Sequence, residues 1–249
     1  MRVAALYDIH GNLPALGAVL RDIVAAHVDQ IIIGGDVVAG PMPTETLDCL
    51  LSQIIPVHFI RGNADREIAA QMTGQEIGDL PAHVREIVVW VADQLKPQHQ
   101  QRIDNWPATL NLMVSGVGPV LFCHATPRND TDVFTRLTPE ARLLPLFAGF
   151  DAALVVCGHT HMQFDRQVGN VRVLNAGSVG MPYGEPGAYW LLLGPTPELR
   201  CTHYDSAQAA ARIHATAYPQ ARYFADTNVV HPPSEAEALA VFTRMEVWS

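Results

Sequence analysis

The chain begins with an apolar run that passes directly into a polar loop: residues 2–12 read RVAALYDIHGN. Arg2 to Tyr7 predicts a buried strand, and Leu13 to His27 has the apolar spacing of an amphipathic helix with Asn12 as its N-cap. Gln30 to Ile33 predicts a second strand. A strand, a helix and a strand in this order indicate two parallel strands joined by a crossover helix.

The same patterns then predict one more parallel strand and a change of architecture. Pro43 to Gln53 predicts a helix, and Ile54 to Ile60 predicts a third strand. Strand patterns are absent from about residue 69 to residue 107, where Leu80 to Leu95 and Pro97 to Trp106 predict helices. We interpret this segment as a helical insertion, which is either a packed subdomain or a mobile lid.

Strand patterns return in the second half of the chain and predict a second sheet, mixed or antiparallel. The predicted strands are Thr109 to Val114, Val120 to His124, Ala153 to Cys157, Gln163 to Val168, Val171 to Leu174, Tyr189 to Leu193 and Leu199 to Tyr204. Two further helices, Ser206 to Tyr218 and Pro233 to about Val247, predict a helical tail from about residue 206 to residue 249. No linker separates these parts, so we expect residues 1–249 to form a single α/β domain.

The composition is that of a globular protein with a substantial core. The chain has 249 residues, of which 49% are hydrophobic, and a net charge of −9 without a basic stripe, which argues against general nucleic-acid or membrane-surface binding. An early carboxylate argues against a signal peptide, and no apolar run approaches ~20 residues, so we expect a cytoplasmic protein without a membrane span. The four cysteines lie too far apart for a C-x-x-C pair, which predicts reduced thiols rather than a disulfide framework or a zinc–thiolate site.

Five short polar motifs fall where predicted strands end, which is where α/β proteins bind ligands. They are DIHGN at residues 8–12, GGD at 34–36, GNAD at 62–65, CHA at 123–125 and GHTH at 158–161. Two of them contain pairs at i and i+2, Asp8 with His10 and His159 with His161, which point to the same side if the chain is extended there. Carboxylate and imidazole ligands suit manganese, iron, zinc or nickel better than calcium or copper(I), and manganese is favoured.

This ordered series resembles the calcineurin-like metallophosphoesterase family, whose pattern is D-x-H, G-D, G-N-x-D or G-N-H-E, a later H, and G-H-x-H. The resemblance implies a four-layer α/β/β/α sandwich of two mixed sheets that holds two divalent ions. It assigns Asp8, His10, Asp36 and His161 to one ion, and Asp36, Asn63, His124 and His159 to the other, with Asp36 as the bridge.

The activity that the resemblance implies is hydrolysis of phosphate esters, either monoesters or diesters, in small molecules or nucleotides. Two metal ions would activate a hydroxide for in-line attack on phosphorus, with Asp36, Asn63 and His124 in the catalytic set. Arg61 matches an arginine that binds phosphate in the phosphoprotein phosphatase branch, although it could equally pair with a carboxylate. Arg128 is a second candidate for the phosphate.

The sequence also departs from parts of the family pattern. The segment after Asp36 reads VVAG and lacks the arginine of the protein phosphatase and bis-nucleosyl tetraphosphatase branch. Ala64 stands where many members have a histidine that acts on the leaving group. Smaller bacterial and archaeal phosphodiesterase-like members also lack that histidine, and residues 175–180 of this chain resemble those members as well. A non-catalytic scaffold with this fold is the alternative function, but such a protein would be expected to lose ligands, and here every ligand position is filled.

Overall fold

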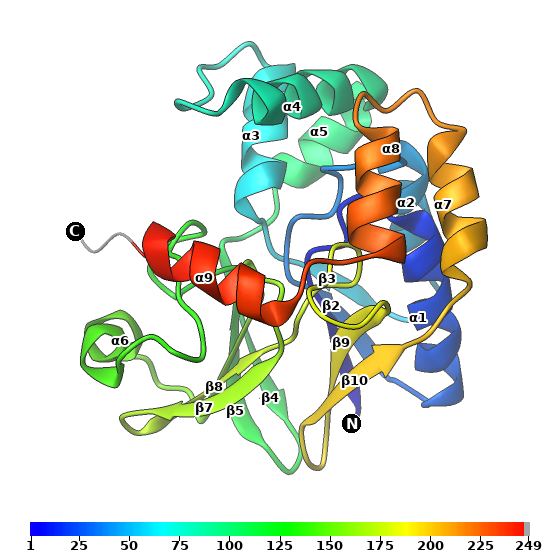
Figure 1. The fold of residues 1–249 in the computed structure, drawn as a ribbon. Helices are drawn as coiled ribbons and strands as arrows, with labels where there is room; N and C mark the ends of the chain where they lie inside the picture. Colours follow the sequence, from blue (N-terminus) through cyan, green and yellow to red (C-terminus); the bar gives the residue numbers. More distant parts are fainter. Residues whose placement is uncertain (247–249) are drawn as a thin grey trace.

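The computed structural model of the chain describes residues 1–246, and its strands form two five-stranded sheets, A and B (Figure 1). Sheet A consists, in spatial order, of β10 (Glu198–Thr202), β9 (Ala188–Leu193), β1 (Val3–Leu6), β2 (Gln30–Ile33) and β3 (Val57–Phe59). The last three are parallel, and α1 (Leu13–Ala25) and α2 (Pro43–Leu51) connect them as crossovers. β9 and β10 extend the sheet antiparallel beside β1.

Sheet B has parallel strands at its centre and antiparallel strands at its edges. It consists, in spatial order, of β4 (Thr109–Val114), β5 (Gly118–Cys123), β6 (Leu154–Cys157), β8 (Val171–Asn175) and β7 (Phe164–Val168). β5, β6 and β8 are parallel, whereas β4 and β7 pair antiparallel with their neighbours. The helix α6 (Glu140–Phe147) lies in the connection between β5 and β6.

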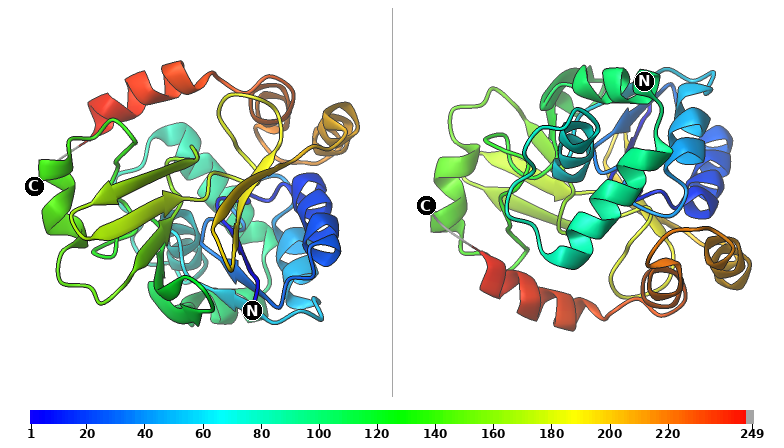
Figure 2. Two further views of the ribbon diagram at one scale, coloured as in Figure 1. Left: turned by 90° about the horizontal axis from the view of Figure 1, so that it is seen from below. Right: turned by 90° about the horizontal axis from the view of Figure 1, so that it is seen from above.

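The two sheets pack face to face and each is covered by helix on its outer face. In β1, Val3 and Ala5 belong to the core between the sheets, while Ala4 and Leu6 face α1 and α2, as the period of two in a strand requires. The outer face of sheet B packs on α6. Figure 2 shows α1 and α6 on opposite sides of the pair of sheets, so the fold has four layers in the order α/β/β/α.

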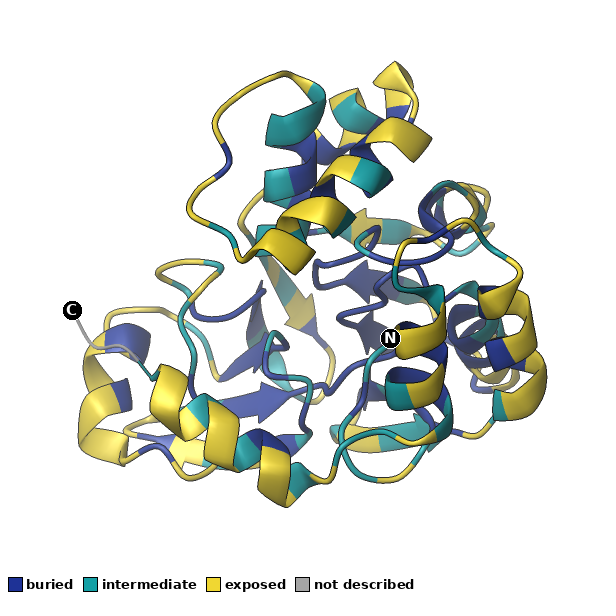
Figure 3. Cartoon of the chain, turned by 45° about the horizontal axis from the view of Figure 1, so that its top comes forward, coloured by how far each residue is buried: buried dark blue, intermediate teal, exposed yellow. Residues whose placement is uncertain are grey.

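The remaining helices gather beside sheet A, except for the last one, whose Glu235 forms an ion pair with Arg136 in the segment before α6. α3 (Asn63–Met72), α4 (Ala82–Gln94) and α5 (Pro97–Asp104) follow β3, and the C-terminal part contains α7 (Ser206–His214), α8 (Ala221–Phe224), the π-helical turn η1 (Ala225–Val230) and α9 (Glu235–Met245). The Trp90 and Tyr218 rings meet edge to face at 5.3 Å, which joins α4 to the segment before α8. In Figure 3 the central strands are buried, whereas these helices carry exposed outer faces.

The structure confirms the predicted fold and corrects it in detail. A strand lies at each predicted position, and Asn12 caps α1 by accepting a hydrogen bond from the Ala15 N–H at 3.2 Å. β9 and β10, however, join the first sheet rather than the second. The helices α3, α6 and α8 were not predicted, and the end proposed for the last helix at Val247 lies outside the described residues.

Candidate metal centre

The polar motifs meet at one end of the sandwich because the parallel strands of both sheets end there. Asp8 and His10 follow β1, Asp36 follows β2, and Asn63 is the first residue of α3 after β3. From sheet B, His124 follows β5, and the pair His159 and His161 follows β6. The carboxyl ends of parallel strands share an edge, so residues far apart in the sequence become neighbours.

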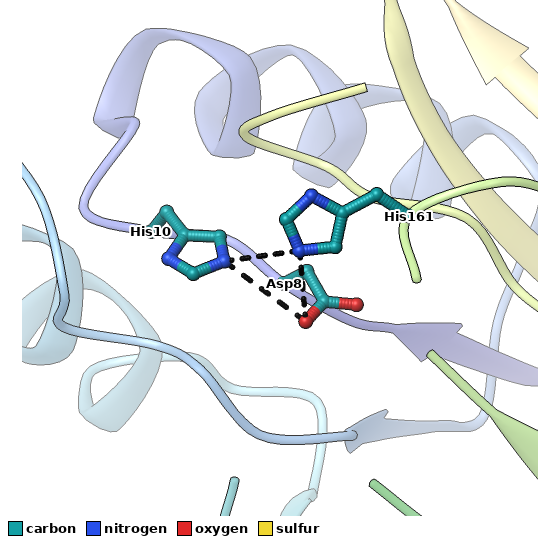
Figure 4. Close-up of side chains that lie close together, drawn as sticks. All are labelled: Asp8, His10 and His161. Carbon is teal, nitrogen blue, oxygen red and sulfur yellow. Dashed lines mark hydrogen bonds and ion pairs between the residues drawn. The ribbon is translucent and has the colours of Figure 1, made fainter. Parts of the chain in front are cut away.

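One group of side chains contains Asp8, His10 and His161, which point toward one another in Figure 4. The Asp8 Oδ1 atom lies 3.4 Å from His161 Nε2 and 4.0 Å from His10 Nε2. The two Nε2 atoms are 3.2 Å apart. Three donor atoms of this kind around one point can hold a divalent cation.

A second group contains Asp36, His124 and His159. His124 Nε2 lies 3.5 Å from Asp36 Oδ2 and 3.2 Å from His159 Nδ1. Asp36 Oδ2 is also 3.9 Å from His10 Nε2 in the first group. The Asp36 carboxylate therefore stands between the two groups.

The backbone at these residues is in a conformation that non-glycine residues rarely adopt. The φ angles are 53° at Asp8, 47° at His10, 51° at Asp36, 64° at His159 and 58° at His161. The chain is therefore not extended between the paired ligands, and the premise used for their common orientation was wrong. Left-handed turns bring the side chains together instead, and strain of this kind gathers at functional sites.

Three of the histidines use their second ring nitrogen to fix their orientation. The Nδ1–H groups of His124 and His161 donate to the carbonyls of Gly34 and Met181, both at 2.8 Å, and the corresponding group of His10 donates to Ala39 at 3.2 Å. A carbonyl can only accept, so the Nε2 atom of each ring is left to face the cluster. Metal-binding histidines in proteins are oriented in this way.

Two buried oxygens in the cluster have no hydrogen-bond partner among the described residues. They are Asp8 Oδ1 and Asn63 Oδ1. A buried carboxylate or amide oxygen without a partner is destabilising unless a cation or another donor satisfies it. Together with the paired imidazole nitrogens, these oxygens fit a site for divalent metal ions.

Comparison with known protein families shows to which family the chain belongs. Residues 1–194 match the model of the calcineurin-like phosphoesterase superfamily domain. The chain belongs to this superfamily. An uncharacterized protein of Methanocaldococcus jannaschii is 26% identical over 196 residues, which are 72% of this chain and 76% of that protein.

Two solved structures share the fold of this calcineurin-like phosphoesterase chain along almost its full length. A hypothetical protein from Pyrococcus horikoshii OT3 has a TM-score of 0.79 at 20% identity and covers 94% of this chain and 99% of its own. A metallophosphoesterase from Sphaerobacter thermophilus has a TM-score of 0.70 at 24% identity, with 92% and 99% covered. Within residues 1–246, no helix combines the length and the apolar character needed to cross a bilayer.

Without a bound metal ion, one imidazole of this calcineurin-like cluster carries a second ring proton and is positively charged. Burial disfavours a charge on His124, but the Asp36 carboxylate outweighs it and raises the pKa of His124 to about 10. Burial likewise disfavours ionised Asp36, and His124 outweighs it and lowers the pKa of Asp36 well below its usual range. Burial and the charge on His124 lower the pKa of His159 to about 4. The proton shared by this group therefore resides on His124.

The two arginine candidates for phosphate binding differ in their surroundings. Arg128 forms two hydrogen bonds with Asp132, at 2.7 and 3.2 Å, so its guanidinium already faces a carboxylate. Arg61 has a buried Nε without a hydrogen-bond partner among the described residues. The sequence left open that Arg61 pairs with a carboxylate, and no such pair is found within residues 1–246. The role of Arg61 in binding phosphate stays a prediction.

Several residues that hold the ligand loops have no obvious signal in the sequence. Asp65 accepts hydrogen bonds from the backbone N–H groups of Val37, at 2.9 Å, and Gly62, at 3.2 Å, and so ties the loops of β2 and β3 together. Asn175 donates to the carbonyl of Gly158 at 2.7 Å, and Ser178 donates to the carbonyl of Asp8 at 2.7 Å. The GNAD motif and the resemblance at residues 175–180 are the only hints of these roles.

Proposed function

We propose that this protein is a metal-dependent phosphoesterase that hydrolyses small phosphate esters with the help of two divalent ions. The observation that carries the proposal is the convergence of imidazole and carboxylate groups at one end of the sandwich, where two buried oxygens, Asp8 Oδ1 and Asn63 Oδ1, have no hydrogen-bond partner among the described residues. Membership of the calcineurin-like phosphoesterase superfamily supports the same chemistry.

The proposed ligand sets follow the two groups of side chains. Asp8, His10 and His161 would hold one ion, Asn63, His124 and His159 the other, and Asp36 would contact both. When bound, such ions polarise water, neutralise phosphoryl oxygens and orient the ester. Manganese is the favoured ion because the ligands combine imidazole with oxygen donors.

The protein itself contributes the orientation of these groups. The Ala64 N–H at the start of α3 donates to Asp36 Oδ1 at 2.9 Å, which leaves Oδ2 directed toward His124 and His10. The helix N-terminus also favours the negative charge of that carboxylate. Arg61 is proposed to bind a phosphoryl oxygen with its guanidinium.

The test is an assay of purified protein with measured metal content. We expect up to two transition-metal ions per chain, hydrolysis of bis(p-nitrophenyl) phosphate or p-nitrophenyl phosphate, loss of activity on exhaustive chelation and recovery with manganese. The matched control is Asp151→Asn, which alters an exposed acidic group outside the cluster. A metal-loaded protein that hydrolyses neither ester nor any member of a wider panel would instead favour a non-catalytic scaffold.

A further inference from the structure

A cavity of about 230 Å³ lies directly beside the metal cluster and shares its wall with it. His10, Asp36 and Asn63 form one side of this cavity. The opposite side is contributed by α4 and by the segment that contains α8 and η1. An ester bound with its phosphorus at the cluster would direct one of its substituents into this space.

The far wall of the cavity is mostly apolar and aromatic. It is formed by Val84, Ile87, Val88, Met181, Tyr218, Tyr223 and Phe224. Val88 and Phe224 are almost completely buried, at 2% and 3% exposure, so these two side chains belong to the packed core of the helical layer. Contact between such a surface and an apolar group of a ligand lowers the free energy of binding, whereas contact with a hydrated group lowers it little.

Beyond the proposed metal ligands, the described lining of the cavity carries a negative charge and no positive one. No lysine or arginine lines it among the described residues, and Glu67 is the one charged lining residue outside the ligand set. Glu67 lies on α3, one turn after Asn63, and burial raises its pKa. The neighbouring Arg66 is engaged by Asp130 through two hydrogen bonds, at 2.8 and 3.1 Å.

We propose that this cavity binds the alcohol part of the phosphate ester, and that it selects an uncharged apolar or aromatic group and excludes an anionic one. The inference rests on the proposed function. The apolar wall stabilises the group by contact, and the Glu67 carboxylate repels a negative charge that no lysine or arginine in the described lining offsets. The amides of Gln220 and Asn228 line the same cavity and offer hydrogen bonds to a neutral polar edge.

The kinetic test uses two esters that differ in one charge, 2-naphthyl phosphate and 6-carboxy-2-naphthyl phosphate. We expect kcat/KM to favour the neutral ester by roughly tenfold, the effect of about 1.4 kcal/mol of repulsion in a partly enclosed site. Glu67→Gln should raise kcat/KM for the carboxylated ester selectively, and Glu67→Lys should reverse the preference. Glu76→Gln, at an exposed position that does not line the cavity, is the matched control.

A binding test without turnover separates this inference from the proposed function. Saturation-transfer NMR on metal-free protein should detect 2-naphthol but not 6-hydroxy-2-naphthoate, and Tyr223→Ala should weaken the naphthol signal. Tyr223 is 64% exposed, so its loss leaves the core intact. Equal handling of both esters and both alcohols, unchanged in Glu67→Gln, would overturn the inference. Selective naphthol binding by a protein that hydrolyses no ester would overturn the proposed function alone.

Discussion

The surrounding structure holds the proposed ligand residues in backbone conformations that non-glycine residues rarely adopt. Of the non-glycine residues with positive φ in the described chain, only His27 lies outside the cluster. Hydrogen bonds between loops hold these conformations, for example from the His10 N–H to the Asp36 carbonyl at 2.9 Å. The unfavourable conformations persist because neighbouring contacts determine them.

At the proposed bridging residue, we expect Asp36→Ala to lower kcat/KM more than the loss of any single terminal ligand, such as His10→Ala. A carboxylate that contacts both ions supports both, and its loss removes several kcal/mol of charge stabilisation, on the order of 10³-fold in rate. Steady-state kinetics with metal analysis of each variant provides the measurement. Near-normal rates and two bound ions in Asp36→Ala would show that another residue bridges.

The protonation of His124 predicts the pH dependence of metal binding. Since the pKa of His124 in the metal-free protein is about 10, this imidazole carries a proton at neutral pH and must lose it to bind a cation. Metal affinity should therefore rise with pH between about 6 and 9, where the ligand carboxylates of Asp8 and Asp36, whose pKa values are lowered, are already ionised. Calorimetry of manganese binding in two buffers of different ionisation enthalpy should detect proton release, and a pH-independent affinity would contradict it.

For the strands, the sequence pattern predicts where each one lies along the chain but not always which strand it pairs with. β9 is apolar on both faces, with Trp190 and Leu192 toward the helices and Leu191 and Leu193 between the sheets. Its periodicity therefore predicts a buried strand without saying which sheet it joins. Pairing with β1 is a contact between distant segments, and such contacts are not visible in a local pattern.

There is also a physical reason why the sequence pattern missed a helix such as α6. α6 contains Pro145, which removes a backbone donor inside the helix, so its local propensity is poor. Burial of Leu143, Leu146 and Phe147 against sheet B outweighs that cost. The proposed site residues have a clearer signal in the sequence than these elements, because most of them lie beside a glycine or at a strand end, whereas their left-handed conformations could not be foreseen.

The first residues of α3 lie where a proton donor for the leaving group would be needed, because Ala64 lines the cavity beside Asn63 and Asp36. Expulsion of an alkoxide needs a proton, a contribution typically of 10²–10⁴-fold, whereas nitrophenolate leaves as the anion. We expect a steep dependence of kcat/KM on leaving-group pKa across aryl and alkyl esters, and a shallower one in Ala64→His. Ala64→Gln is a control of similar bulk. A flat wild-type series with rate-limiting chemistry would mean that another residue donates the proton.

Across the whole molecule, each group of the proposed metal centre takes ligands from both sheets. Asp8 follows a strand of sheet A and His161 a strand of sheet B, and the same is true of Asp36 and His124. Away from this end, the sheets are held by an apolar core that includes Leu191 and Phe122. Bound ions would therefore clamp one end of a sandwich whose interior is already packed.

This arrangement predicts that metal stabilises the protein without being required for folding. Free manganese at 100 times its dissociation constant should add about 2.7 kcal/mol, which corresponds to a rise in Tm of roughly 5–10 °C for a chain of this size. Calorimetric scans with manganese and with chelator give the difference, while far-UV circular dichroism at 25 °C should stay unchanged. Asp36→Asn should lose most of the metal-dependent shift, and the exposed Asp151→Asn should keep it. Unfolding on chelation at 25 °C would show that the core between the sheets does not suffice, because the ions would then supply folding free energy that the apolar contacts lack.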